Sequence, residues 1–198
     1  MRELLGPVVE RLDEKMMPES QLAPQAYVDV YPELFAKLRA AGWTGECFPT
    51  YPQPSWTDEA DQFMPHPTAL DFIVQFEGLS ISEPGRYSSG KLAEYTNHIK
   101  FYPGSAFAHM KTTCDDYYLD VRDILEDPDP FPVAESNGQI LFLTQSGRTA
   151  FIDQTLCGYN RAPNPFVLFN TYLFSVNDDR IDGKAGYFGQ RITGRPWW

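Results

Sequence analysis

Apolar side chains recur at intervals of three and four residues in several parts of the chain, which is the period of an amphipathic α-helix. Over residues 32–41 the apolar face contains Leu34, Phe35 and Leu38. Gly42 follows directly and suits the left-handed position that commonly ends a helix. The pattern therefore predicts a helix over residues 32–41.

Four further helices are predicted from the same period and from proline or glycine at their ends. They cover residues 1–20, residues 67–77, residues 115–126 and a segment that begins at Asn164-Pro165. In the helix over 67–77 the expected apolar stripe is Leu70, Ile73 and Val74, broadened by Phe72 and Phe76. In the last helix it is Phe166, Phe169, Leu173 and Val176.

Short apolar runs predict only a few strands. "QILFL" and "RTAFI", on either side of "TQSG", form a predicted β-hairpin with Gly147 in its turn, and residues 99–102 form one more strand. Residues 80–92 read as a loop, residues 128–138 as a turn, and residues 44–67 as an irregular, proline-rich segment. This order favours one α+β domain over residues 1–198, with several helices around a small mixed or antiparallel sheet.

The net charge of the chain bears on the kind of partner that it could bind. The 16 basic and 27 acidic residues give a formal net charge of −11. Such a charge repels nucleic acid and anionic membranes. It either attracts a basic partner or serves solubility alone. We expect no membrane span, because no apolar run approaches about 18 residues. We expect no secretion signal, because the N-terminal segment carries acids throughout and lacks a continuous apolar core followed by a small-residue cleavage site. Three unclustered cysteines fit reduced thiols and a cytoplasmic location.

The sequence contains no recognisable motif for catalysis or for cofactor binding. Its histidines and cysteines are scattered: His66, His98, His109, Cys47, Cys114 and Cys157. They do not have the spacing of a zinc site, and no glycine-rich phosphate loop occurs. We therefore expect no catalytic residue, no metal and no cofactor; a small hydrolase that uses Cys114 with His109 is the alternative.

Acidic residues are concentrated over residues 115–129, where Arg122 is the only cation. The seven acids are Asp115, Asp116, Asp120, Asp123, Glu126, Asp127 and Asp129. One interpretation is a solvated helix face followed by an Asp-Pro turn. The other is a negative patch that steers association with a basic protein. We take these seven acids as the candidate partner-binding residues.

Three segments, in their order and spacing, resemble the SUKH superfamily, and most closely its SUKH-3 branch. They are "LRAAGWTG", "HPTALDFIVQFEGLSI" and "FPVAESNGQILFLTQSGRTAFI", within residues 33–175. The matching positions are Gly42, Trp43, Phe76, Gly78, Leu79, Pro132, Glu135 and Gly147. The N-terminal helix and a Gly-rich, basic tail over 180–198, expected to be partly flexible, fall outside the resemblance.

The resemblance implies a SUKH-type α+β domain without enzymatic activity or cofactor. Bacterial members of this superfamily are mostly immunity proteins, which bind and neutralise a cognate toxin of a polymorphic toxin system, often a nuclease or deaminase. Together with the acid excess, this implies a basic protein toxin as the partner. A SUKH scaffold that binds another cellular protein is the alternative. The chain departs from the family pattern at Thr44-Gly45-Glu46, where a Pro-Gly-Arg-like segment is usual, and at Glu77, where a second glycine is common.

Trp43 follows a helix that ends at a glycine, so its ring can fold back onto the apolar face of that helix. Its position in the family pattern is structural. We therefore expect Trp43 to be buried in the core.

Overall fold

The computed structural model describes residues 22–45, 65–86, 91–103, 117–153, 158–176 and 178–184, with the backbone alone for residues 117–120 and 184. The predicted helix over residues 1–20, most of the proline-rich segment and residues 185–198 of the tail lie outside the described residues.

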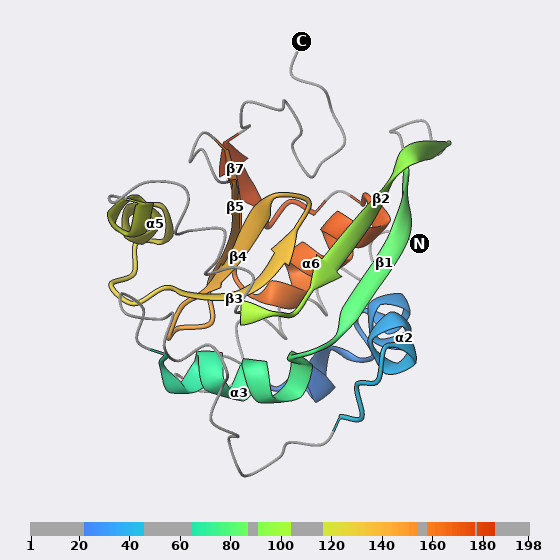
Figure 1. Cartoon of the computed structure of the whole chain (residues 1–198), viewed down its shortest axis with the longest axis horizontal. Helices are drawn as coiled ribbons and strands as arrows, with labels where there is room; N and C mark the ends of the chain where they lie inside the picture. Colours follow the sequence, from blue (N-terminus) through green and yellow to red (C-terminus); the bar gives the residue numbers. More distant parts are fainter. Residues whose placement is uncertain are drawn as a thin grey trace.

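Four α-helices and one short 3₁₀ helix form in this part of the chain (Figure 1). They are η1 (Pro24–Tyr27), α2 (Pro32–Ala40), α3 (Pro67–Phe76), α5 (Tyr117–Leu125) and α6 (Pro165–Phe174). The four predicted helices that fall on described residues are confirmed. Three of them begin with proline, whose missing N–H costs no hydrogen bond in the first turn.

Seven strands of the described residues form one antiparallel sheet, in which neighbours in space are also neighbours in the sequence. They are β1 (Ser80–Arg86), β2 (Leu92–Lys100), β3 (Phe131–Ser136), β4 (Gln139–Leu143), β5 (Thr149–Asp153), β6 (Tyr159–Ala162) and β7 (Asp182–Lys184). The predicted α+β class, with helices around an antiparallel sheet, is confirmed, and the β4–β5 hairpin is where the sequence places it. The sheet is larger than predicted.

The loop predicted over residues 80–92 is wrong for residues 80–86, which form β1 and pair along β2 from Lys100 to Leu92. The sequence pattern of this strand is weak, because Ile81 is the single large apolar side chain that β1 buries. Pro84 is tolerated because β1 is an edge strand, which pairs with β2 alone. Lys37 of α2 contacts this strand through Glu83, with 2.6 Å between Nζ and Oε2.

Three more strands are absent from the prediction. Residues 131–136, read as part of a turn, form the fully buried strand β3. The turn itself is Asn137-Gly138, whose φ values of 44° and 80° match the tight turns that favour this dipeptide. Strands β6 and β7 are rich in polar residues and form by pairing onto β5. Residues Asp182–Lys184 of the predicted tail form strand β7.

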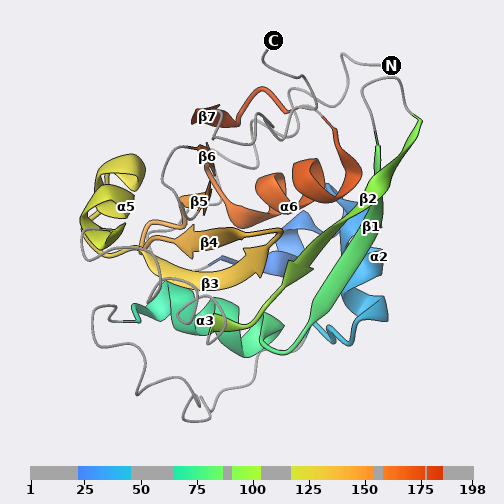
Figure 2. The same ribbon diagram turned by 45° about the horizontal axis from the view of Figure 1, so that its top comes forward.

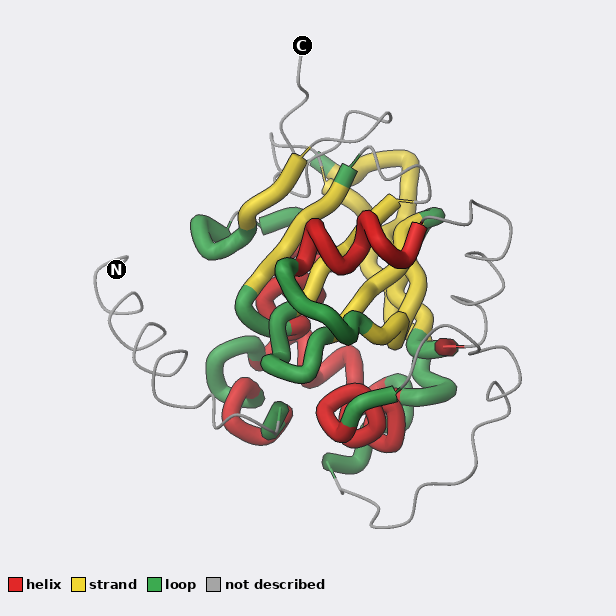
Figure 3. The backbone as a smooth tube through the Cα atoms, turned by 90° about the vertical axis from the view of Figure 1, so that its left-hand side faces the viewer, coloured by secondary structure: helices red, strands yellow, loops and turns green. Residues whose placement is uncertain are grey.

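Helix α6 lies across one face of the sheet, which curls around it (Figures 2 and 3). It contacts β1 and β2 on one side and β5 and β6 on the other. Because strands surround the helix, residues 165–169 are all buried. The helix ends before Ser175, which has a left-handed φ of 53°. Val176, predicted on the apolar stripe, lies beyond the helix and is 41% exposed.

Phenylalanine rings join α6 to the other elements. The ring centroid of Phe166 lies 5.3 Å from that of Phe35 in α2 and 6.1 Å from that of Phe76 in α3. Phe169 lies 5.3 Å from Phe101, which follows β2. Burying each such side chain contributes about 1.5–3 kcal/mol. These contacts form the centre of the core.

The phenylalanine contacts also decide which face of α3 is buried. Ala69, Phe72 and Phe76 are inaccessible or nearly so, whereas Leu70 and Val74 are half-buried. The buried face of α3 is therefore centred on Phe72 and Phe76 and not on Leu70 and Val74. The two phenylalanine rings point towards the rings of α6.

The end of α2 places Trp43 against its own helix. The Trp43 N–H donates to the Leu38 carbonyl at 2.9 Å, and the Gly42 N–H to the Arg39 carbonyl at 3.0 Å. Gly42 has a φ of 112°, which a side chain would make unfavourable. This pair of bonds is the Schellman ending, which reverses the chain direction.

The Trp43 ring is 5% exposed, so the expected burial is confirmed. Its centroid lies 5.0 Å from that of Phe35 and 6.1 Å from that of Phe76. The tryptophan therefore joins α2 to α3 within the core.

We expect Trp43→Ala to lower the free energy of unfolding by about 3–5 kcal/mol, because it leaves a cavity between two helices. Trp43→Phe should lower it less, since the indole Nε1 has no hydrogen-bond partner among the described residues. Urea unfolding followed by circular dichroism measures both. A loss below about 1 kcal/mol for Trp43→Ala would contradict this role.

Candidate functional site

Helix α5, which carries the acidic segment, lies at the opposite end of the molecule from α2 (Figure 1). Val121 and Leu125 are buried and Ile124 is half-buried, as the predicted apolar face requires. These side chains dock the helix beside β5. The polar face of α5 is therefore turned to solvent.

The seven predicted partner-binding acids differ in how far the structure describes them and in how exposed they are. Asp115 and Asp116 lie outside the described residues, and Asp120 is described by its backbone alone. Asp123, Glu126 and Asp129 are exposed, and Asp127 is half-buried. The structure thus brings the last four together at the end of α5.

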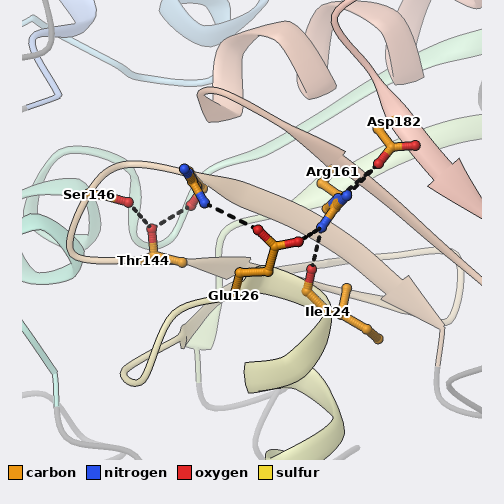
Figure 4. Close-up of polar contacts among 7 residues, drawn as sticks. Ile124, Glu126, Thr144, Ser146, Arg161 and Asp182 are labelled. Atoms are coloured by element: carbon orange, nitrogen blue, oxygen red, sulfur yellow. Dashed lines mark hydrogen bonds and ion pairs between the residues drawn. The ribbon is translucent and has the colours of Figure 1, made fainter.

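The charge of Glu126 is compensated within the molecule (Figure 4). Its Oε1 lies 3.1 Å from Arg161 Nη1, and its Oε2 lies 3.9 Å from Arg148 Nη1. Glu126 follows the last residue of α5 with a left-handed φ of 55°. Glu126 therefore differs from the other candidate acids in being paired with cations of the same chain.

Arg161 links β6 to the end of α5 and to β7 (Figure 4). Besides Glu126, its Nη1 donates to the Ile124 carbonyl at 3.0 Å. Its Nε and Nη2 donate to Asp182 Oδ2 at 3.1 Å and 2.5 Å. The hydrogen bonds with Asp182, and then that with Glu126, raise the pKa of Arg161. A cation at the carbonyl end of a helix is favourable, because that end carries partial negative charge.

Three acids remain without a cationic partner among the described residues: Asp123, Asp127 and Asp129, hereafter the acidic surface. Asp127 Oδ1 accepts the backbone N–H of Asp129 at 3.1 Å, which shapes the Asp-Pro turn. Asp127 and Asp129 follow the negative pole of α5, where carboxylates do not stabilise a helix. Their charges therefore face solvent without a benefit to α5.

His66 lies within electrostatic range of the acidic surface and caps α3. Its Nδ1 accepts the Ala69 N–H at 3.1 Å, and its Nε2 lies 3.0 Å from the Leu143 carbonyl. Both contacts are satisfied by a neutral ring with the proton on Nε2. Burial lowers the pKa of His66, and this outweighs the Leu143 hydrogen bond and the charges of Asp127 and Asp129, which raise it.

The positions shared with the SUKH pattern have structural roles. Trp43 and Phe76 belong to the core, and Gly42 ends α2. Glu135 of β3 pairs with Lys100 of β2 at 3.4 Å, at the point where these two strands meet. Trp43, Phe76, Gly42 and Glu135 thus act in the core, at a helix end and at a strand pair.

The arginines beside the acidic surface were not predicted from the sequence. Arg161 stands 35 residues from Glu126 along the chain and comes from a short polar strand. A single arginine in such a strand has no periodicity or motif that distinguishes it. Its partners become evident only when β6 pairs with β5 and β7.

Within the described ranges, His, Cys, Asp and Glu side chains do not gather in groups of three or more that could hold a metal ion. None of the helices described is both long and apolar enough to cross a membrane. His109 and Cys114, the residues of the alternative hydrolase, lie outside the described residues. Comparison of the chain with protein-family models, curated proteins and solved structures found no match.

We expect the burial of His66 to make stability depend on pH. The folded state lowers the pKa of this ring, whereas the unfolded chain takes up a proton near the ordinary pKa of 6.5. Stability contributed by the neutral ring is therefore lost as the pH falls below about 6.5 towards the lowered pKa of the folded state. His66→Asn keeps a good capping residue and removes the titration.

Urea unfolding of both proteins between about pH 7.5 and pH 5 tests this expectation. The free energy of unfolding should fall more steeply for the wild type than for His66→Asn. Parallel curves over this range would show that His66 does not carry the effect.

Proposed function

We propose that this chain is an immunity protein of SUKH type, which neutralises a basic toxin by stoichiometric binding in the cytoplasm. The proposed toxin is a nuclease or another nucleic-acid-modifying enzyme of a polymorphic toxin system. The acidic surface is the observation that carries the proposal: three carboxylates without an internal cation among the described residues, displayed at one end of the molecule. The SUKH-like order of motifs supports a toxin as the class of partner.

Charge complementarity provides the physical basis. An enzyme that acts on nucleic acid presents lysines and arginines to the phosphates. Carboxylates of the acidic surface can pair with those cations and exclude the nucleic acid, without any chemical step. The net charge of −11 extends the attraction beyond the contact. Such steering can raise association rates to about 10⁸ M⁻¹s⁻¹ at low salt.

A purely solubilising role accounts less well for the placement of these acids. Solubility is served by charges of both signs dispersed over the surface. Asp127 and Asp129 instead adjoin the negative pole of α5, where they do not stabilise the helix. Arg148 and Arg161 compensate Glu126 and leave its neighbours uncompensated. This arrangement favours an external cationic partner.

The triple variant Asp123→Asn, Asp127→Asn and Asp129→Asn removes the charges and keeps the side-chain shapes. The amide introduced by Asp127→Asn retains an oxygen that can accept the Asp129 backbone N–H. We expect the Kd for the toxin encoded by the neighbouring gene to rise about 10- to 100-fold, since each exposed pair is worth up to about 1 kcal/mol. Calorimetric titration between about 50 and 500 mM NaCl should also show a weaker salt dependence for the variant.

A matched control removes three exposed charges elsewhere, through Asp29→Asn, Glu94→Gln and Asp179→Asn. We expect this control to bind nearly as the wild type does and to protect cells that express the toxin. An equal loss in both triple variants would show that net charge alone matters. A neighbouring gene product that neither binds the chain nor is neutralised by it would refute the immunity function.

A further inference from the structure

We infer that Arg161 is the residue that positions the acidic surface, by holding the end of α5 against the sheet. The consequence for partner binding rests on the proposed function. The consequence for the order of α5 does not, because it follows from intramolecular contacts alone.

Helix α5 depends on contacts from outside the helix. It has nine residues, whereas isolated helices shorter than about 12–15 residues are marginal in water. Among its described side chains, Val121 and Leu125 are buried and Ile124 is half-buried. The contacts of Arg161 with the Ile124 carbonyl and with Glu126 add a polar attachment at the end of the helix.

Arg161 is suited to provide that attachment. Its backbone is paired on both sides, with Ala150 of β5 and with Asp182 of β7. The Asp182 carboxylate holds two of its guanidinium nitrogens. The remaining nitrogen, Nη1, meets both the Ile124 carbonyl and Glu126. The guanidinium thus joins a fixed strand to the backbone of the last helical turn.

Arg148 offers an internal comparison, because it approaches the same carboxylate. Its Nη1 lies 3.9 Å from Glu126 Oε2, and its side chain is 57% exposed. In the described contacts it donates no hydrogen bond to the backbone of α5. Arg148 and Arg161 therefore contribute equal charge beside Glu126, but Arg161 alone of these two also binds the helix backbone.

The test compares Arg161→Gln with Arg148→Gln, which change the net charge equally. We expect amide hydrogen exchange over residues 121–126 to become about tenfold faster in Arg161→Gln and to stay near the wild-type rate in Arg148→Gln. Asp182→Asn, which weakens the hold on Arg161 without altering β6, should shift exchange in the same direction. Equal exchange in both arginine variants would overturn the inference. If Arg161→Gln fails to fold, unchanged exchange in Asp182→Asn would overturn it.

Binding to the toxin of the neighbouring gene provides a second readout. Both variants make the chain more acidic, so electrostatics alone would leave binding of a basic partner equal or tighter. We expect this for Arg148→Gln, whereas Arg161→Gln should bind about tenfold more weakly. Arg161→Lys, which keeps the charge, should recover part of the loss. Tighter binding by Arg161→Gln would contradict a positioning role.

The two readouts separate the two proposals. Faster exchange in Arg161→Gln without any binding of the toxin by the wild type would support the attachment and refute the proposed function. Toxin binding that Arg161→Gln leaves intact, with unchanged exchange, would support the function and refute the positioning role.

Discussion

The packing of the curled sheet around α6 is the constraint on which the rest of the structure depends. Strands from both ends of the sheet contact this helix, so it must be apolar on nearly every side. Phe166 and Phe169 extend the contact to α2, to α3 and to the segment after β2. Trp43 and Phe76 join the same cluster, which explains why the motif "AAGW" and the phenylalanine-rich helix occur together.

This centre of packing leaves α5 outside. Two of its described side chains, Val121 and Leu125, are buried. The helix is attached in addition by Arg161, which comes from a strand paired on both sides. A helix attached in this way can carry charges that the core would exclude, because its carboxylates remain in water. The acidic surface provides the negative charge, and Arg161 fixes the position of that charge.

The sequence predicts what local chemistry determines. The helices were predictable because their ends carry signals, such as Asn164 before Pro165 and Gly42 after α2, and the acidic segment was visible as composition. Strand β1 was not predictable, because its inward positions carry little apolar surface and it contains Pro84. The sequence also could not predict that Glu126 is paired with arginines while the neighbouring acids, within the described residues, are not. This pairing depends on an arginine 35 residues away in the chain, which only the sheet brings near.

The most direct test of the central claim is a map of the bound surface by nuclear magnetic resonance. Isotope-labelled chain would be titrated with an inactive form of the toxin encoded beside it, and the backbone amide shifts followed. The account predicts that the largest changes fall on residues 121–130, with little change in the β1–β2 pair at the other end of the sheet. Changes concentrated on β1 and β2, with residues 121–130 unaffected, would contradict it.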